Sequence, residues 1–135
     1  MTLTDAGPLV ALIDTNEAKH EVCRLLLPRL VKPLLTTYSC FTEAMYLLRR
    51  ELGYPGQQAL WRLRSSGLLI VHPSSEAELD RLADLMSQYK DTPMDLADAS
   101  LVAAAEILGM RRVFTLDRHF YAYRLADGSA LEVVP

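Results

Sequence analysis

At 135 residues, with half of them hydrophobic, the chain is long enough to fold as one domain (1–135) with a sizeable core that needs no disulfides. Its formal net charge of -3 excludes a general attraction to phosphate, so any contact with nucleic acid must come from a local patch. The chain lacks a charged start with an apolar segment and any run near the ~20 apolar residues that cross a bilayer, which predicts a cytoplasmic location.

Two composition features limit the chemistry further. Cys23 and Cys40 have apolar neighbours and no metal-binding spacing, so we predict that both are buried thiols. The positive charge is mostly arginine, with eleven Arg against three Lys. Arginine suits phosphate and carboxylate alike, so this bias fits an RNA substrate or an acidic partner, and it equally fits a GC-rich genome.

The first half of the chain alternates short β-like runs with helical stretches, starting with a strand over residues 1–4. A turn at 5–8, where Pro8 can open a helix, leads into apolar residues up to 13. A second helix is expected from about 16 to 27, and Pro28 ends or kinks it. A strand over 34–38 and a helix that Gly53 caps follow.

The second half continues the alternation with a helix from Pro55 to about 65 and an unbroken apolar run over 68–71, as expected for a strand covered on both faces. Ser75 and Glu78 predict a capping box for a helix to about 89. The next helix is expected to have Thr92 as its cap, and it runs to Gly109. Strands over 112–116 and 131–134 complete the chain, the last at an edge. The pattern predicts an α/β fold, a mostly parallel central sheet with helices on both faces.

Two acids follow strands directly. Asp5 comes after the first predicted strand and Asp117 after the fourth. Parallel sheets bind ligands beyond the carboxyl ends of their strands, where both acids are expected. Each acid has a simpler interpretation as the N-cap of the helix or short helical turn that follows it.

Two further acids lie on predicted helices. Glu43 is near the start of the helix after the second strand, where it points at the same sheet edge or only balances the positive helix end. Asp98 is surrounded by small and apolar residues over 96–101, out of reach of a cap at Thr92. Burying an unpaired carboxylate costs several kcal/mol, so a metal or cationic partner is the better explanation for Asp98. Asp95 shares its helix face and is assigned to the cap or to the outer part of a site.

Four converging carboxylates would repel one another, whereas a bound Mg²⁺ or Mn²⁺ would keep them ionised. Such an ion activates water and stabilises charge on a phosphodiester. The three histidines lie in different segments, so no zinc site is indicated. The quartet Asp5, Glu43, Asp98 and Asp117 therefore predicts catalysis by a divalent ion.

The chain resembles PIN-domain ribonucleases of the VapC toxin type. The resemblance rests on four short stretches in order along the chain, at 3–10, 42–43, 95–102 and 114–118. It implies a PIN-like domain and a Mg²⁺- or Mn²⁺-dependent endoribonuclease with that quartet as its acidic pocket. Asp5, Asp98 and Asp117 would hold the metal and Glu43 would orient the ion or the attacking water, while Thr115 and Asp95 support the site.

The resemblance also implies a homodimer and a cognate antitoxin protein that blocks the pocket. For the RNA backbone we consider the arginines Arg49, Arg50, Arg62, Arg64 and Arg118, each of which is individually better explained by a solvated helix face.

Other families fit less well. A haloacid-dehalogenase-type enzyme needs a second Asp where Gly7 stands, and a response-regulator receiver needs a lysine at the end of a late strand, which is absent here. Two alternatives stay open: a PIN nuclease of RNA processing outside toxin pairs, and a catalytically silent PIN-like binding module.

Overall fold

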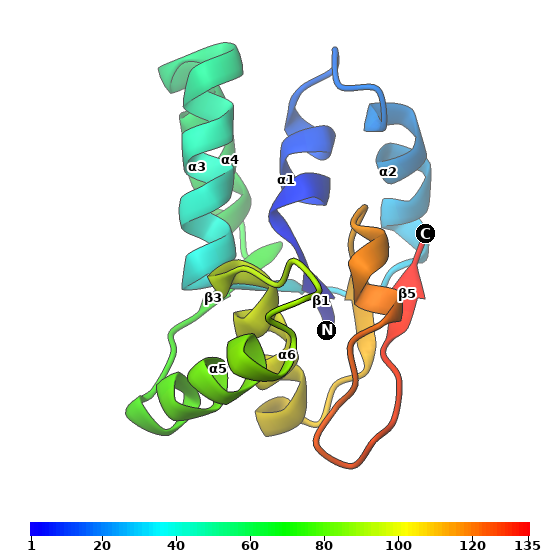
Figure 1. Ribbon diagram of the computed structural model, residues 1–135. Helices are drawn as coiled ribbons and strands as arrows, with labels where there is room; N and C mark the ends of the chain where they lie inside the picture. The colour runs from blue at the N-terminus through cyan, green and yellow to red at the C-terminus, as the bar shows by residue number, and fades with distance from the viewer.

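The computed structural model describes residues 1–135 and is built around one five-stranded sheet (Figure 1). The strand order is β3-β2-β1-β4-β5, and all four neighbouring pairs are parallel. The central strand β1 therefore has two later strands on each side, and ligands bind at such a switch point in open α/β sheets. The strands are β1 (Thr2–Thr4), β2 (Leu34–Thr37), β3 (Leu69–His72), β4 (Arg112–Phe114) and β5 (Glu132–Val134).

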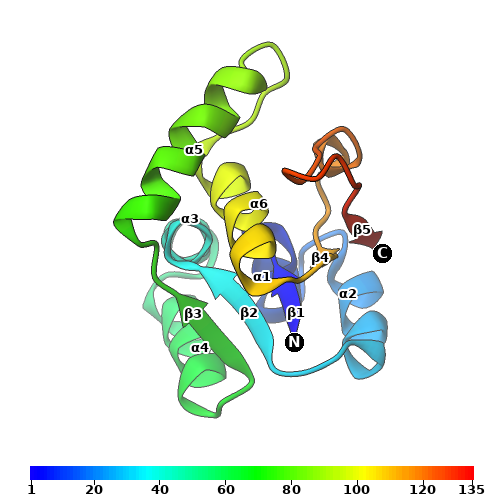
Figure 2. The same ribbon diagram turned by 90° about the horizontal axis from the view of Figure 1, so that it is seen from below.

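Helices cover both faces of the sheet, as the sequence predicts; Figure 2 shows α5 and α6 on one side and α2 and α4 on the other. The helices are α1 (Ala6–Ile13), α2 (His20–Leu26), α3 (Tyr38–Leu52), α4 (Tyr54–Ser65), α5 (Glu76–Gln88) and α6 (Leu96–Leu108), with 3-10 turns η1 (Leu27–Arg29) and η2 (Arg118–Tyr121). None of these helices has both the length and the apolar character needed to cross a bilayer.

The core surrounds α6, in which every residue from Ala97 to Ala105 is buried. A helix that is apolar all round belongs in the interior, because it has no polar face to turn to water. Phe114, Phe120 and Tyr123 are fully buried and belong to the same hydrophobic cluster. The two cysteines are free and buried, which confirms the prediction made for them.

The start of α6 differs from the prediction. The N-cap is Asp95 and not Thr92, and the helix begins at Leu96. Asp95 accepts a hydrogen bond from the backbone N–H of Asp98, and Asp98 accepts one from the backbone N–H of Asp95, which completes a capping box. Two reciprocal bonds satisfy two free N–H groups at once, so this acidic pair sets the helix start.

Two other predictions are wrong in detail. Strand β3 is an edge strand, and Ile70 in it is 42% exposed, although its apolar run indicated a strand covered on both faces. Helix α2 begins only at His20, because the Asp14 side chain accepts a hydrogen bond from the backbone of Asn16 and holds a turn there. The predicted capping box of Ser75 and Glu78 is confirmed.

Candidate acidic site

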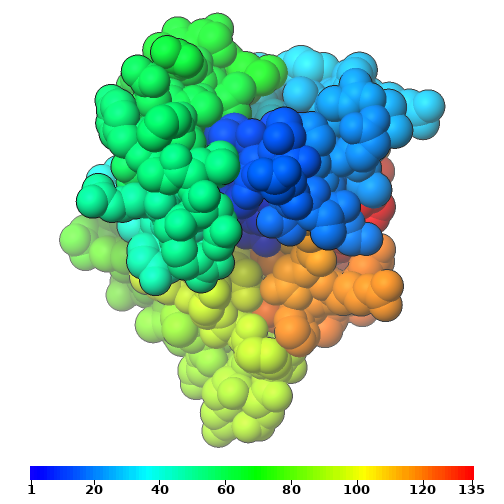
Figure 3. All heavy atoms as spheres, turned by 90° about the horizontal axis from the view of Figure 1, so that it is seen from above, coloured from blue at the N-terminus to red at the C-terminus, as the bar shows by residue number.

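Five carboxylates line one cavity of about 250 Å³. They come from the end of β1, from α3, from the start of α6 and from the segment after β4, which meet on the face shown in Figure 3. The cavity is lined by Asp5, Glu43, Asp95, Asp98 and Asp117 together with Gly7, Leu47 and Leu116. The structure thus brings the predicted quartet and Asp95 together, and no Lys, Arg or His lines the cavity with them.

Asp5 is 7% exposed and is held by two short hydrogen bonds. One oxygen accepts the backbone N–H of Ala6 at 2.7 Å, so Asp5 does cap α1 as its simpler interpretation predicted. The other accepts the hydroxyl of Thr115 at 2.7 Å, and the same hydroxyl oxygen accepts the backbone N–H of Asp117 at 3.0 Å. Thr115 therefore joins the acids that follow β1 and β4.

Asp98 is 6% exposed and has more partners than its sequence context indicated. Besides the capping bond to the backbone N–H of Asp95, its carboxylate accepts the Tyr123 hydroxyl at 3.3 Å. The prediction that Asp98 lies out of reach of the helix cap is wrong, because the helix starts three residues later than expected. Tyr123 was missed by the sequence reasoning, and no motif or spacing marks it.

The remaining two quartet acids are more accessible. Asp117 caps η2 by accepting the backbone N–H of His119, and its carboxylate lies 2.8 Å from His119 Nδ1. Glu43 lies in the second turn of α3 rather than the first, is exposed, and makes no side-chain hydrogen bond. These two side chains can therefore move toward a ligand at smaller cost than Asp5 or Asp98.

Burial and mutual repulsion raise the pKa of three carboxyl groups in the acidic cavity, because both effects disfavour the ionised form. Burial, and then the neighbouring Asp95 and Asp5, raise the pKa of Asp98 to about 7. Burial also raises the pKa of Asp5, against the opposing effect of the Thr115 hydrogen bond. Although Glu43 is exposed overall, partial desolvation of its carboxyl at the cavity and then the charge of Asp5 raise its pKa. A cation in the cavity would reverse all three shifts.

The donor set fits a hard divalent cation in its chemistry, since carboxylate oxygens are the ligands that Mg²⁺ and Mn²⁺ prefer. No three acids are arranged around one ion position, however. Asp5, Asp98 and Asp117 direct oxygens to backbone N–H groups and hydroxyls, and the outer acids would have to rotate inward to share an ion. Cys40 is no alternative ligand, because its buried thiol, 3.8 Å from Asp5, has a strongly raised pKa caused mainly by burial.

The candidate RNA-binding arginines are spread over the surface. Arg118 lines a second cavity next to the acidic one. Arg49 and Arg50 lie in the last turn of α3 and line neither cavity, and Arg50 pairs with Glu51 at 2.9 Å. Arg62 and Arg64 lie in the last turn of α4, which precedes β3 and so approaches the amino ends of the strands.

Comparison with known proteins gives both a sequence relative and solved structures of the same fold. No protein-family model matches the chain. Ribonuclease VapC26 of Mycobacterium tuberculosis is 27% identical over 134 residues, which are 98% of this chain and 99% of that protein. The crystal structure of M. tuberculosis VapC20, described as a sarcin-ricin loop cleaving toxin, matches with a TM-score of 0.84 and 17% identity over all of both chains.

Two other solved structures share the fold. One is a toxin–antitoxin complex from Klebsiella pneumoniae, with a TM-score of 0.69 and 18% identity over 100% of this chain and 97% of that one. The other is FitAB bound to a DNA fragment, with a TM-score of 0.61 and 19% identity over 87% and 85% of the two chains. The predicted α/β PIN-like fold is confirmed.

Proposed function

We infer that this chain, which resembles VapC-type PIN-domain proteins along its whole length, is an endoribonuclease that hydrolyses RNA phosphodiester bonds as the toxin of a toxin–antitoxin pair. We further propose that it acts as a single nuclease domain, that it depends on Mg²⁺ or Mn²⁺, and that it works in the cytoplasm, where its RNA substrates are. The observation that carries this proposal is the cavity lined by five carboxylates and no cationic side chain.

The unfavourable state of the acids supports metal dependence. Buried carboxylates without a cationic partner cost free energy, and here burial and neighbouring acids raise the pKa values of Asp5, Glu43 and Asp98. Such a cluster does not stabilise the metal-free protein, so its presence is better explained by the binding of a divalent ion that takes part in the reaction. The names of the relatives agree with RNA as the substrate.

In this proposal Asp5, Asp98 and Asp117 hold the ion directly or through water, and the ion when bound supplies an activated water and stabilises the charge that develops on the phosphodiester. Glu43, which is exposed and free of hydrogen bonds, orients the attacking water or the ion. Thr115 keeps Asp5 in place through its 2.7 Å hydrogen bond, and Tyr123 does the same for Asp98.

The partners are proposals of the same kind. A toxin–antitoxin complex among the solved structures of this fold supports a cognate antitoxin protein as partner. That the antitoxin covers the acidic cavity is proposed from the family resemblance. A homodimer is proposed from the family resemblance alone, and sedimentation of the purified chain tests it.

The test is RNA cleavage by purified protein in Mn²⁺ or Mg²⁺ and in EDTA, with total RNA as substrate. Asp5→Asn and Asp117→Asn keep the size of each side chain and remove one negative charge. We expect each to lower cleavage at least about 100-fold, because each loses an ionic oxygen ligand. Asp80→Asn, at an exposed position on α5, is the matched control and should cleave like wild type.

Growth inhibition on expression is the second readout of the same variants. If Asp5→Asn still inhibits growth and still cleaves RNA in a metal-dependent way, the metal-nuclease assignment is wrong. Growth inhibition that persists without any cleavage identifies a catalytically silent binding module instead. Cleavage that removes defined precursor segments without inhibiting growth identifies a nuclease of RNA processing.

A further inference from the structure

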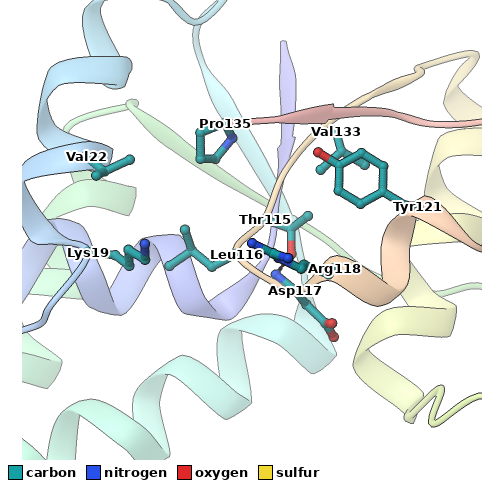
Figure 4. A pocket seen from close by; sticks show the side chains of 9 residues that line it. All are labelled: Lys19, Val22, Thr115, Leu116, Asp117, Arg118, Tyr121, Val133 and Pro135. Carbon is teal, nitrogen blue, oxygen red and sulfur yellow. Dashed lines mark hydrogen bonds between the residues drawn. The ribbon is translucent and has the colours of Figure 1, made fainter.

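A second cavity of about 520 Å³ adjoins the acidic one and shares Leu116 and Asp117 with it. We call it the basic cavity; it lies between the start of α2, the segment from Thr115 to Tyr121, and β5, and its principal residues are Lys19, Arg118 and Tyr121 (Figure 4). Its volume falls in the range of about 300–1,000 Å³ that is usual for small-ligand sites.

The two cations in this cavity have no acidic partner. Lys19 and Arg118 are exposed, and neither side chain makes a hydrogen bond or ion pair within the protein. In Figure 4 their nitrogens point into the cavity from opposite sides of Leu116, whereas the carboxylate of Asp117 is directed away from them. Asp117 is instead paired with His119. The cavity therefore presents two free positive charges beside a cluster of negative ones.

The rest of the cavity wall is apolar or aromatic. Tyr121 is 59% exposed, and its ring lines the cavity together with Val133 (Figure 4). Val22 is also exposed, at 42%. A free aromatic face next to two cations suits a nucleotide, because bases stack on aromatic rings while the phosphate binds the cations.

We propose that the basic cavity binds the RNA nucleotide next to the bond that is cut, with Lys19 and Arg118 on its phosphate and Tyr121 stacked on its base. The inference rests on the proposed function, since it takes RNA as the substrate of the acidic cavity. The physical reason is charge: a cluster of carboxylates repels a polyanion, so the strand needs cationic anchors within one nucleotide of the reaction centre.

Binding is measured in EDTA with a fluorescent single-stranded RNA of about ten nucleotides, so that no cleavage occurs. We expect Lys19→Ala/Arg118→Ala to weaken binding at least about 10-fold and to flatten the dependence of log K on log salt by about 0.7 for each lost phosphate contact. Tyr121→Ala should weaken binding about fivefold with an unchanged salt slope, since it removes stacking and no charge.

Matched controls are Lys90→Ala and Arg29→Ala, which also remove exposed cations but line neither cavity. Both should bind RNA like wild type. Lys19→Arg keeps the charge and should restore most of the binding lost in Lys19→Ala. Thermal unfolding of every variant shows that the fold is intact.

Wild-type affinity of the double variant would overturn the proposal. So would an acidic peptide of equal length that binds as tightly as RNA and with the same dependence on Lys19 and Arg118, since the cavity would then be a protein-binding site. A Tyr121→Ala variant that binds like wild type would remove the stacking part.

Cleavage in Mn²⁺ separates this inference from the proposed function. We expect the double variant to raise KM at least about 10-fold with kcat within about threefold of wild type, because the lost contacts are to bound RNA and not to the reacting atoms. If wild type cleaves RNA and the double variant matches it in both constants, the nuclease assignment stands and this inference fails. If wild type binds RNA through the basic cavity and cleaves none, the nuclease assignment fails and the RNA subsite stands.

Discussion

Carboxylates with little solvent exposure have different kinds of partners in two regions of the molecule. In the α5–α6 layer, away from the acidic cavity, the two least exposed acids have basic partners: Glu106 accepts two hydrogen bonds from Arg81, at 2.9 and 2.8 Å, and a third from the backbone of Ala126. In the same layer Glu78 lies 3.0 Å from the ring of His72. In the acidic cavity, Asp5 and Asp98 accept hydrogen bonds from hydroxyl, backbone N–H and thiol groups, and from no cationic side chain.

The acids with a basic partner stabilise the packing of the fold, whereas the acids of the cavity are positioned by the fold. Arg81 and Glu106 connect α5, α6 and the segment before β5, so their pairing stabilises the packing of three parts of the chain. Asp5 and Asp98 in the cavity are positioned by hydrogen bonds that leave their charge uncompensated. Their region should therefore lose activity when a carboxylate is neutralised, and the α5–α6 layer should lose stability.

The largest expected effect is on catalysis. Asp98→Asn should lower kcat/KM for RNA at least about 100-fold, because the amide keeps the capping bond but is a weak metal ligand. The measurement is Mn²⁺-dependent cleavage of a defined RNA by folded variant. Activity within threefold of wild type would show that Asp98 only caps α6.

Next in size is a loss of stability in the other region. Glu106→Gln should lower the free energy of unfolding by about 2 kcal/mol, since it leaves the partly buried Arg81 without its ionic partner. Chemical denaturation measures the change, and RNA cleavage should persist. Glu51→Gln removes an exposed pair with Arg50 and serves as the control, with a change below about 1 kcal/mol. Equal effects of the two variants would contradict the comparison.

A smaller effect is expected from the residue that joins two cavity acids. Thr115→Val keeps the shape of the side chain but removes the hydroxyl that Asp5 accepts, and should lower kcat about 10-fold. Thr115→Ser should restore most of the rate, because it returns the hydroxyl. A purely structural role would instead lower the stability of the valine variant while leaving kcat and the apparent affinity for Mn²⁺ unchanged.

The smallest effect concerns pH and the metal-free protein. The folded state raises the pKa of Asp98 from 3.8 to about 7, so the stability linked to this group is complete below about pH 4 and is lost as pH rises through about 7. Asp98→Asn should therefore gain stability over wild type in EDTA at pH 8, on the order of 1 kcal/mol, and little at pH 4. Calorimetry measures the stability difference between variant and wild type at each pH. Added Mn²⁺ at pH 8 should raise the Tm of the wild-type protein only.

The positions of Asp5 and Asp117 could be predicted from the sequence. Both residues follow strands of a parallel sheet, and the carboxyl ends of such strands lie at the same edge. The capping box at Ser75 was also predictable, since it depends only on residues that are neighbours in the chain. Strand β3 was misjudged as fully covered, because an apolar run does not reveal that no strand pairs beyond it.

The start of α6, the contact of Tyr123 and the positions of the arginines could not be predicted, because they depend on contacts that no local sequence pattern encodes. Thr92-Pro93 and Asp95 offer competing helix starts, and only the reciprocal bonds between Asp95 and Asp98 decide between them. Tyr123 reaches Asp98 because η2 turns the chain back toward α6, which no spacing predicts. Among the arginines, position in the fold rather than charge separates Arg118 from Arg49 and Arg50.

The hydrogen bond from Thr115 to Asp5 joins residues 110 positions apart in the chain. Asp5 is synthesised before β4 and the segment that follows it, so the pairing of β1 with β4 must wait for these later residues. A growing chain therefore holds no complete acidic cavity until Asp117 has been made. Any chemistry that needs all five carboxylates is thus absent from a chain that has been synthesised only as far as β4.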